Sequence, residues 1–488
     1  MNAPRAARAM LQRAFDGWRG APPVTDLPAP EEASGGPAWA PPTGDLVAGP
    51  LNRALFRLAG PAILAKAMHA LLTLVDVLWV GRLGAAPTAA VTTSFFASWI
   101  LSSATDLTAL GILAHVSRNV GAGDRRRAGY AAAQGLLLGT VLGIGLAVLA
   151  WFGAPGLFRA LGTEPDVARS GVTYLRVLFL AAPLTFAYTN CEFLMRASGN
   201  TRTPMLITGG MVLFNAVLDP LLIYGIGPFP RLEVLGAAIA TVLAQVVAVA
   251  GFAWRAAARD AHFPLEARGL RRLDLPLARS IVGIGLPGMA IGVFYSTIYL
   301  FMSGITARLG TRELAILGLA NRAESVTYLA SNGFAAATAT LVGQNLGARR
   351  PDRAERAAWL SAGWMGLYGL VLGSVLVIWP RAVLGIFTSD PQIIEQGAPY
   401  LRLLGYAQPL MAIEIVFEHA FAGAGNTLPP MLISVPMNSL RIPLLLWVVF
   451  ELEAGLLGIG WVLSLTCIVR GAMAALWFRR GGWKRRRL

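Results

Sequence analysis

Runs of about twenty apolar residues recur along almost the whole chain, and each is long enough to cross a bilayer as an α-helix. We count twelve such runs, centred near residues 70, 102, 140, 180, 214, 245, 291, 329, 368, 408, 440 and 466. Only helices and closed barrels can span lipid, and the strands of a barrel would be short and alternating. The sequence therefore predicts an all-α polytopic membrane protein with twelve transmembrane helices.

The composition agrees with this prediction. Of the 488 residues, 55% are hydrophobic and 14% are charged, whereas soluble domains carry about 25% charged residues. The two cysteines, Cys191 and Cys467, lie in different apolar runs, and no two of the four histidines have metal-ligand spacing. The chain shows no phosphate-binding loop and no nucleophile motif. We therefore expect a protein that is not an enzyme and that has no cofactor and no metal site.

Basic residues are unevenly divided between the two sets of loops. If the N-terminus is cytoplasmic, the cytoplasmic segments hold 28 of the 41 Lys and Arg residues, and the opposite loops hold seven. The positive-inside rule then predicts that both termini are cytoplasmic, and a bacterial inner membrane is the default location. The net charge of +15 thus indicates contact with an anionic membrane face rather than with nucleic acid.

The chain also repeats itself at an offset of 226 residues. ASGNTRTPM, from Ala197, matches GAGNTLPPM, from Gly423, and NVGAGDRRRAGYAA, from Asn119, matches NLGARRPDRAERAA, from Asn345. Each copy holds six runs, so the copies share one orientation, which is typical of transporters with a site between two repeats. We predict a polar, disordered cytoplasmic tail and two six-helix lobes joined by a basic linker and followed by a basic tail: 1–45, 46–256, 257–278, 279–478 and 479–488.

Six motifs resemble those of multidrug and toxic compound extrusion (MATE) transporters. They are VDVLWVGRLG (75–84), NVGAG (119–123), RASGNTRTPM (196–205), NAVLDPLLIYG (215–225), GAAIAT (236–241) and ATLVGQNLGA (339–348). The resemblance covers about residues 50 to 478. It implies a V-shaped pair of lobes. It also implies an antiporter in which uptake of protons or sodium drives export of amphipathic, often cationic, compounds.

Two intramembrane aspartates break the repeat. Asp76 falls on Met302, and Asp219 falls on Leu445, or on Ile442 if nearby prolines are matched. An acid at membrane depth costs about 2.5–3.5 kcal/mol even on the most lenient scale. Acids that only one copy retains therefore indicate a function, and we expect that function to be ion coupling in the N-terminal lobe.

The surroundings of Asp219 suit a proton or a small cation. Asn215 lies four residues earlier on the same helix face, and Pro220 removes one backbone hydrogen bond, which can free a carbonyl oxygen. Oxygen ligands of this kind suit sodium. The resemblance implies that Asp76, Asn215 and Asp219 form the cation site of branches that couple through the N-terminal lobe, with Thr241 as a further member. The alternative is structural, with Asp219 capping a broken helix or pairing with an arginine.

The first span carries a polar stripe. Lys66, His69, Thr73 and Asp76 fall within about 80° of one helix face. One interpretation is a wet face that serves as a proton path to Asp76. The other is that Lys66 pairs with a neighbouring acid and that His69 is hydrogen-bonded in the core. Unchanged proton-driven export in His69→Ala would rule out the path.

Other acids in the spans provide alternatives. Glu192 and Glu418 are equivalent in the repeat, and Glu192 can reach Arg196 four residues later, so a structural ion pair is favoured there. Glu414 lies one turn before Glu418. These three acids, Glu192, Glu414 and Glu418, are the alternative coupling groups.

Two further spans carry candidate substrate-facing residues. Glu324, Tyr328 and Asn332 share a polar face of the eighth span, and Tyr295 and Tyr299 lie in the seventh. Aromatic rings of this kind can receive flat cations by cation–π contact, although ordinary packing explains them equally well. The seventh span has no acid, which weakens a coupling mechanism in the C-terminal lobe.

We predict a secondary antiporter that works by alternating access as a monomer in membrane lipid, with a small amphipathic substrate and no nucleic-acid partner. One alternative is a flippase for lipid-linked precursors of the same superfamily. Another is a receptor or scaffold that transports nothing. The charge of the central cavity discriminates between the exporter and the flippase, since a cation exporter should be acidic there and a precursor flippase basic.

Overall fold

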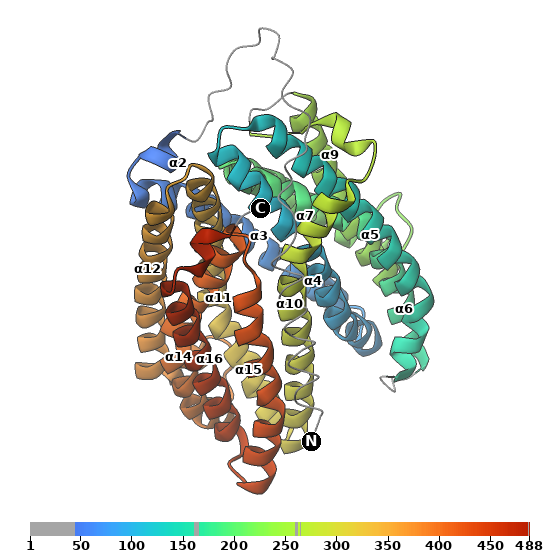
Figure 1. Cartoon of the computed structure of the whole chain (residues 1–488). Helices are drawn as coiled ribbons and strands as arrows, with labels where there is room; N and C mark the ends of the chain where they lie inside the picture. Colours follow the sequence, from blue (N-terminus) through green and yellow to red (C-terminus); the bar gives the residue numbers. More distant parts are fainter. Residues whose placement is uncertain (1–43, 161–164, 259–261, 264, 487) are drawn as a thin grey trace, which may run out of the picture.

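The computed structural model describes residues 44–160, 165–258, 262–263, 265–486 and 488 (Figure 1). The tail predicted for 1–45 therefore lies almost entirely outside the described residues. In the described part of the chain every regular element is helical. A short helix, α2 (Gly44–Ala48), precedes the first lobe.

Each half of the chain forms a bundle of long helices. The N-lobe comprises α3 (Leu51–Gly81), α4 (Ala85–Gly121), α5 (Arg125–Ala160), α6 (Pro165–Leu180), α7 (Ala182–Ala197), α8 (Arg202–Tyr224) and α9 (Glu233–Ala257). The C-lobe comprises α10 (Leu275–Leu309), α11 (Thr311–Gly347), α12 (Pro351–Ile378), α13 (Pro380–Gly385), α14 (Pro391–Gly423), α15 (Leu428–Leu446) and α16 (Gly455–Arg479). Single turns flank them at η1 (Ala267–Leu270), η2 (Trp447–Glu451) and η3 (Gly482–Arg485).

The helices supply six spans in each lobe. Within the described residues, nine helices are long and apolar enough to cross a membrane, and α6 with α7 forms a tenth span that bends by 52°. The remaining two, α11 and α14, are 37 and 33 residues long, which is enough to cross a membrane, but they are less apolar than the others. The prediction of an all-α membrane protein with twelve spans in two repeats is confirmed.

The first helix of each lobe begins inside the other lobe. Leu55 and Leu58 of α3 are buried in the hydrophobic core formed by α11, α12, α14 and α16. The repeat equivalent of Leu55 is Ile281, near the start of α10, which is buried in the core formed by α4, α5, α7 and α9. The two lobes are therefore joined by reciprocal packing. The start of each first helix buries its apolar surface in the core of the opposite lobe.

The lobes meet at one end of the molecule, which we call the basic end. We define it by the described residues of its loops and tail: 122–124, 198–201, 258, 262–263, 265–274, 348–350, 424–427, 480–486 and 488. In Figure 1 this end lies at the top, and the two groups of helices diverge toward the bottom. A Cβ atom added to Gly121 would lie 2.0 Å from the carbonyl oxygen of Gln344, and one added to Gly347 would lie 1.9 Å from that of Arg118. Since these pairs are equivalent in the repeat, α4 and α11 cross backbone to backbone about the pseudo-symmetry axis.

The basic tail packs against both lobes. Trp483 is 1% exposed, stacks on Phe478 with ring centroids 4.5 Å apart and donates a hydrogen bond to the Phe478 carbonyl. Lys484 lies 2.6 Å from a carboxylate oxygen of Glu355, and this hydrogen bond raises the pKa of Lys484 above its usual value. From the N-lobe, Arg118 donates to the carbonyl oxygen of Arg486 at 2.6 Å.

Replacing Trp483 by alanine is expected to release this tail, since deletion of a buried Trp costs about 3–5 kcal/mol and only a few polar contacts remain. Trypsin should then cut after Arg479 much faster than in wild type, as measured by mass spectrometry. Trp254→Ala is the matched control, because Trp254 is 67% exposed. Equal cleavage rates in Trp483→Ala and wild type would show that Trp483 does not hold the tail.

Candidate functional site

Two carboxyl groups from different helices meet inside the N-lobe. Asp219 and Asn215 are both 0% exposed, and the Asn215 amide donates a hydrogen bond of 3.3 Å to Asp219 Oδ1. Asp76 approaches them from α3, and its carboxyl group interacts electrostatically with that of Asp219. The three predicted residues Asp76, Asn215 and Asp219 are thus brought together by the packing of α3 on α8.

The oxygen atoms of this cluster are short of partners. Three buried atoms, Asp76 Oδ1, Asn215 Oδ1 and Asp219 Oδ2, accept no hydrogen bond from the residues that the structure describes. In the described part of the chain neither aspartate forms an ion pair with a Lys or Arg. This favours the functional interpretation of Asp219 over an arginine partner, and both stay predictions. A buried group of oxygens without donors is suited to a proton or a hard cation.

Thr241 lies on the neighbouring helix α9 but turns its hydroxyl group to its own helix, where it donates to the Ala237 carbonyl at 3.0 Å. Tyr174 of α6, which the sequence analysis did not select, lies within electrostatic reach of both Asp76 and Asp219. Its agreement with Tyr400 in the repeat is the signal that could have found it.

The polar stripe of α3 is only partly described. Lys66 lies half-buried in the electrostatic field of Glu192 and Asp106, which favours the interpretation that it balances neighbouring acids. The side chain of Thr73 lies outside the described residues. The proton path through Lys66, His69 and Thr73 therefore stays a prediction.

Glu192 forms the expected ion pair. Its carboxylate contacts the guanidinium of Arg196 one turn later on α7, and both side chains are buried. The charge of Glu192 is thus balanced within its own helix, as the i, i+4 spacing predicted.

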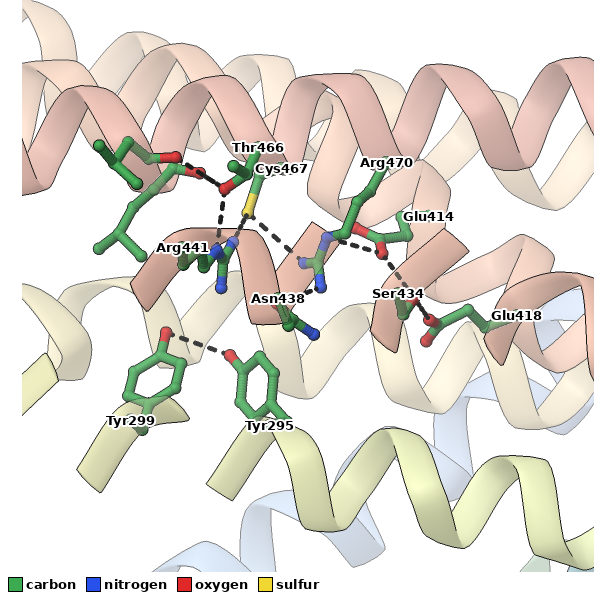
Figure 2. Close-up of polar contacts among 12 residues, drawn as sticks. Tyr295, Tyr299, Glu414, Glu418, Ser434, Asn438, Arg441, Thr466, Cys467 and Arg470 are labelled. Carbon is green, nitrogen blue, oxygen red and sulfur yellow. Dashed lines mark hydrogen bonds and ion pairs between the residues drawn. The ribbon is translucent and has the colours of Figure 1, made fainter. Parts of the chain in front are cut away.

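Glu414 and Glu418 are held in a polar network rather than facing each other alone (Figure 2). The Nε atom of Arg470, on α16, lies 3.2 Å from Glu414 Oε1. Ser434 donates to Glu418 at 2.8 Å, and Arg470 donates to Asn438 at 3.0 Å. Sequence reasoning missed Arg470 as the partner. Its only signal was a charged residue at depth in an apolar run.

The candidate substrate-facing residues separate into two groups. Tyr295 and Tyr299 of α10 lie with ring centroids 4.7 Å apart and share a hydrogen bond of 3.1 Å between their hydroxyl groups. Trp99, from α4 of the N-lobe, packs edge-on against Tyr295 at 5.6 Å. These three rings, which we call the aromatic group, therefore lie at the boundary between the lobes.

The residues of α11 form the other group. Glu324 accepts a hydrogen bond of 2.9 Å from the amide of Gln408, on α14. Asn332 donates to the Tyr328 carbonyl on its own helix at 2.9 Å, and the side chain of Tyr328 is 46% exposed. Glu324 is thus the charged member of this face, and Asn332 is used within its own helix.

A family model supports the reading of the repeat. The MatE model matches residues 61–221 and again residues 287–447. The two matches start 226 residues apart, which is the offset of the internal repeat. The chain belongs to the MatE family. The resemblance to MATE transporters found in the motifs is thereby confirmed.

Relatives and solved structures agree with this assignment. The chain is 27% identical to a probable multidrug resistance protein NorM of Thermotoga maritima, over 89% of this chain and 94% of that protein. It is also 27% identical to a FAD transporter of Shewanella oneidensis, over 85% and 89%. A transporter of the MOP superfamily from Pyrococcus furiosus has the same fold, with a TM-score of 0.83, 23% identity and coverage of 91% and 98%.

Membership of the MatE family makes the chain an integral membrane transporter of small molecules, which is no enzyme and needs no cofactor. These predictions from the sequence are confirmed.

Proposed function

We propose that this MATE transporter is a secondary antiporter that exports small amphipathic molecules in exchange for protons or sodium ions. The observation that carries the proposal is the cluster of Asp76, Asn215 and Asp219, which only one of the two repeats possesses. One buried oxygen atom of each side chain has no hydrogen-bond donor among the described residues. Two neighbouring carboxylates in a low-dielectric lobe repel each other strongly. A proton or a cation between them removes this cost, so their occupancy can follow the ion gradient.

Alternating access provides the link to export. The lobes touch backbone to backbone at the basic end and diverge at the other (Figure 1). The positive-inside rule places the basic end in the cytoplasm, so this conformation opens to the outside of a bacterial inner membrane. Ion binding from outside would favour release of substrate there. Binding of substrate from inside would favour release of the ion, as the lobes rock about the site between them. We infer that a monomer in lipid performs the cycle.

The proposal is tested in proteoliposomes that contain the full-length protein. Export of an amphipathic dye is driven first by an imposed proton gradient and then by a sodium gradient, for wild type, Asp76→Asn and Asp219→Asn. We expect each variant to lose ion-driven export by about tenfold or more, since it removes an interaction that only the coupled state needs. Glu233→Gln, at an exposed acid of the same lobe, is the control and should export normally.

The outcomes separate the alternatives. If the variants lose export under one of the two gradients but not under the other, the ion of that gradient is the coupling ion. Export that survives both substitutions would reject coupling in the N-lobe and turn attention to Glu414 and Glu418. A wild-type protein that exports no dye under any gradient would favour the precursor flippase.

A further inference from the structure

The second copy of the candidate ion site has a different chemistry. At the repeat offset, Asn215 falls on Arg441 of α15, and Thr241 falls on Cys467 of α16. The positions of the two aspartates are occupied by Met302 and Leu445, both fully buried in the apolar core of the C-lobe. Where the N-lobe has carboxylates and amide oxygens, these positions of the C-lobe hold a guanidinium and no acid.

Two hydrogen bonds hold the guanidinium group of Arg441 in place and engage two of its three nitrogen atoms (Figure 2). It is 1% exposed. Its Nε donates to Thr466 Oγ1 at 2.8 Å and its Nη2 donates to Cys467 Sγ at 3.3 Å. The Thr466 hydroxyl gives its own proton to the Val462 carbonyl at 2.7 Å, so its oxygen is free to accept. The thiol sulfur is a weak acceptor.

The remaining nitrogen, Nη1, has no hydrogen-bond partner in the described part of the chain, and it is not among the atoms that are wholly enclosed without one. It is therefore the guanidinium nitrogen that the described residues leave available to a ligand. No carboxylate of the described residues forms an ion pair with Arg441. The other buried arginine of this region differs, since Arg470 has both Glu414 and Asn438 as partners.

Arg441 faces the aromatic group. Its charge acts on the hydroxyl groups of both Tyr295 and Tyr299, and Figure 2 shows these hydroxyl groups on the side of the rings that is nearer Arg441. The side of Arg441 that faces the aromatic group thus presents hydroxyl groups and rings. Glu324 and Glu414 are within electrostatic reach of Arg441, but each is held by another partner, Gln408 and Arg470 respectively.

We propose that Arg441 and the hydroxyl groups of Tyr295 and Tyr299 bind the anionic group of a planar amphipathic substrate whose rings lie against the aromatic group. The anionic group would be a carboxylate, sulfonate or phosphate, which guanidinium groups bind by charge-assisted hydrogen bonds. An arginine within the membrane that forms no ion pair with an acid of the described residues is costly and indicates a function. The proposal rests on the transport function above and assigns its substrate class.

The test is a binding measurement with the purified full-length protein in detergent. The probes are two xanthene dyes with the same ring system, one with a free carboxylate and one with that group as a methyl ester. Arg441→Gln should weaken binding of the carboxylate dye by about tenfold or more and change binding of the ester by less than about twofold. Arg441→Lys should restore most of the affinity, because the charge returns.

Glu324→Gln provides a prediction of opposite sign. If the substrate is anionic, removing this nearby negative charge should tighten binding of the carboxylate dye. Arg322→Gln, at an exposed arginine of the same helix α11, is the control and should change neither dye.

The proposal is wrong if Arg441→Gln leaves the carboxylate dye unaffected, or if Glu324→Gln weakens binding while Arg441→Gln strengthens it, as a cationic substrate requires. A thermal unfolding curve for each variant excludes misfolding as the cause, and the lysine variant keeps the test decisive if glutamine is not tolerated. Because binding needs no ion gradient, its outcome is independent of the export experiment with Asp76→Asn and Asp219→Asn.

Discussion

Replacing Gly347 by valine is expected to prevent the lobes from closing at the basic end and to reduce export by about tenfold or more. The Cβ atom would lie 1.9 Å from the Arg118 carbonyl oxygen, which is backbone and cannot turn away. Overpacking costs about 1–3 kcal/mol even where side chains can move, and each 1.4 kcal/mol shifts an equilibrium about tenfold. The strain exists only when the ends of α4 and α11 touch, so the variant should favour the conformation in which they part.

The measurement is the distance between spin labels at Arg126 and Arg356, two exposed positions at the basic ends of α5 and α12, in a background with both native cysteines replaced by alanine. The distance distribution should move to longer values in Gly347→Val and in its repeat equivalent Gly121→Val. Gly318→Val is the control on the same helix, because a Cβ there meets nothing within 4 Å. Unchanged distances and unchanged export in Gly347→Val would show that this close approach is not needed for closure.

Replacing Glu414 by glutamine is expected to destabilise the C-lobe by about 3–5 kcal/mol, because it leaves Arg470 as an uncompensated buried charge. Both side chains are at most 7% exposed. Removing both charges, in Glu414→Gln with Arg470→Gln, should recover much of the loss, since the cost comes from the unpaired partner rather than from the missing attraction. Chemical unfolding in mixed micelles measures the free energy of unfolding for the single and double variants.

The exposed pair of Arg381 and Glu395 provides the control. Its nitrogen and oxygen atoms are 2.8 Å apart, much as in the buried pair, but both side chains are 60% exposed. Water and salt screen such a pair, so Glu395→Gln should leave the unfolding free energy unchanged. A Glu414→Gln variant that unfolds like wild type yet loses ion-driven export would contradict the structural role and make Glu414 a coupling acid.

The contrast between Asp219 and Arg470 shows how far sequence reasoning reaches. Asp219 could be selected because an acid in one copy of a repeat stands out against an apolar residue in the other. Asn215 could be placed beside it because residues four apart share a helix face. The partner of Arg470 could not be named, since Glu414 lies 56 residues earlier and periodicity within a helix does not say which other helix it faces. The repeat aligns Arg441 with Asn215, but the sequence does not show which side chains surround Arg441.

The class of the protein and its duplication follow from local properties of the chain. An apolar run that is long enough to span a membrane is removed from water in any arrangement of the helices. The offset between repeated segments can likewise be found without knowing how the helices pack. Contacts between distant segments depend on how twelve helices choose their neighbours. Helix packing alone brings Asp76 near Asp219. It also gives Arg470 an ion pair with Glu414, whereas Arg441 forms no ion pair with any described residue. It also brings the backbones of α4 and α11 together at Gly121 and Gly347. Each of these contacts depends on two helices, so the sequence of one helix cannot determine it.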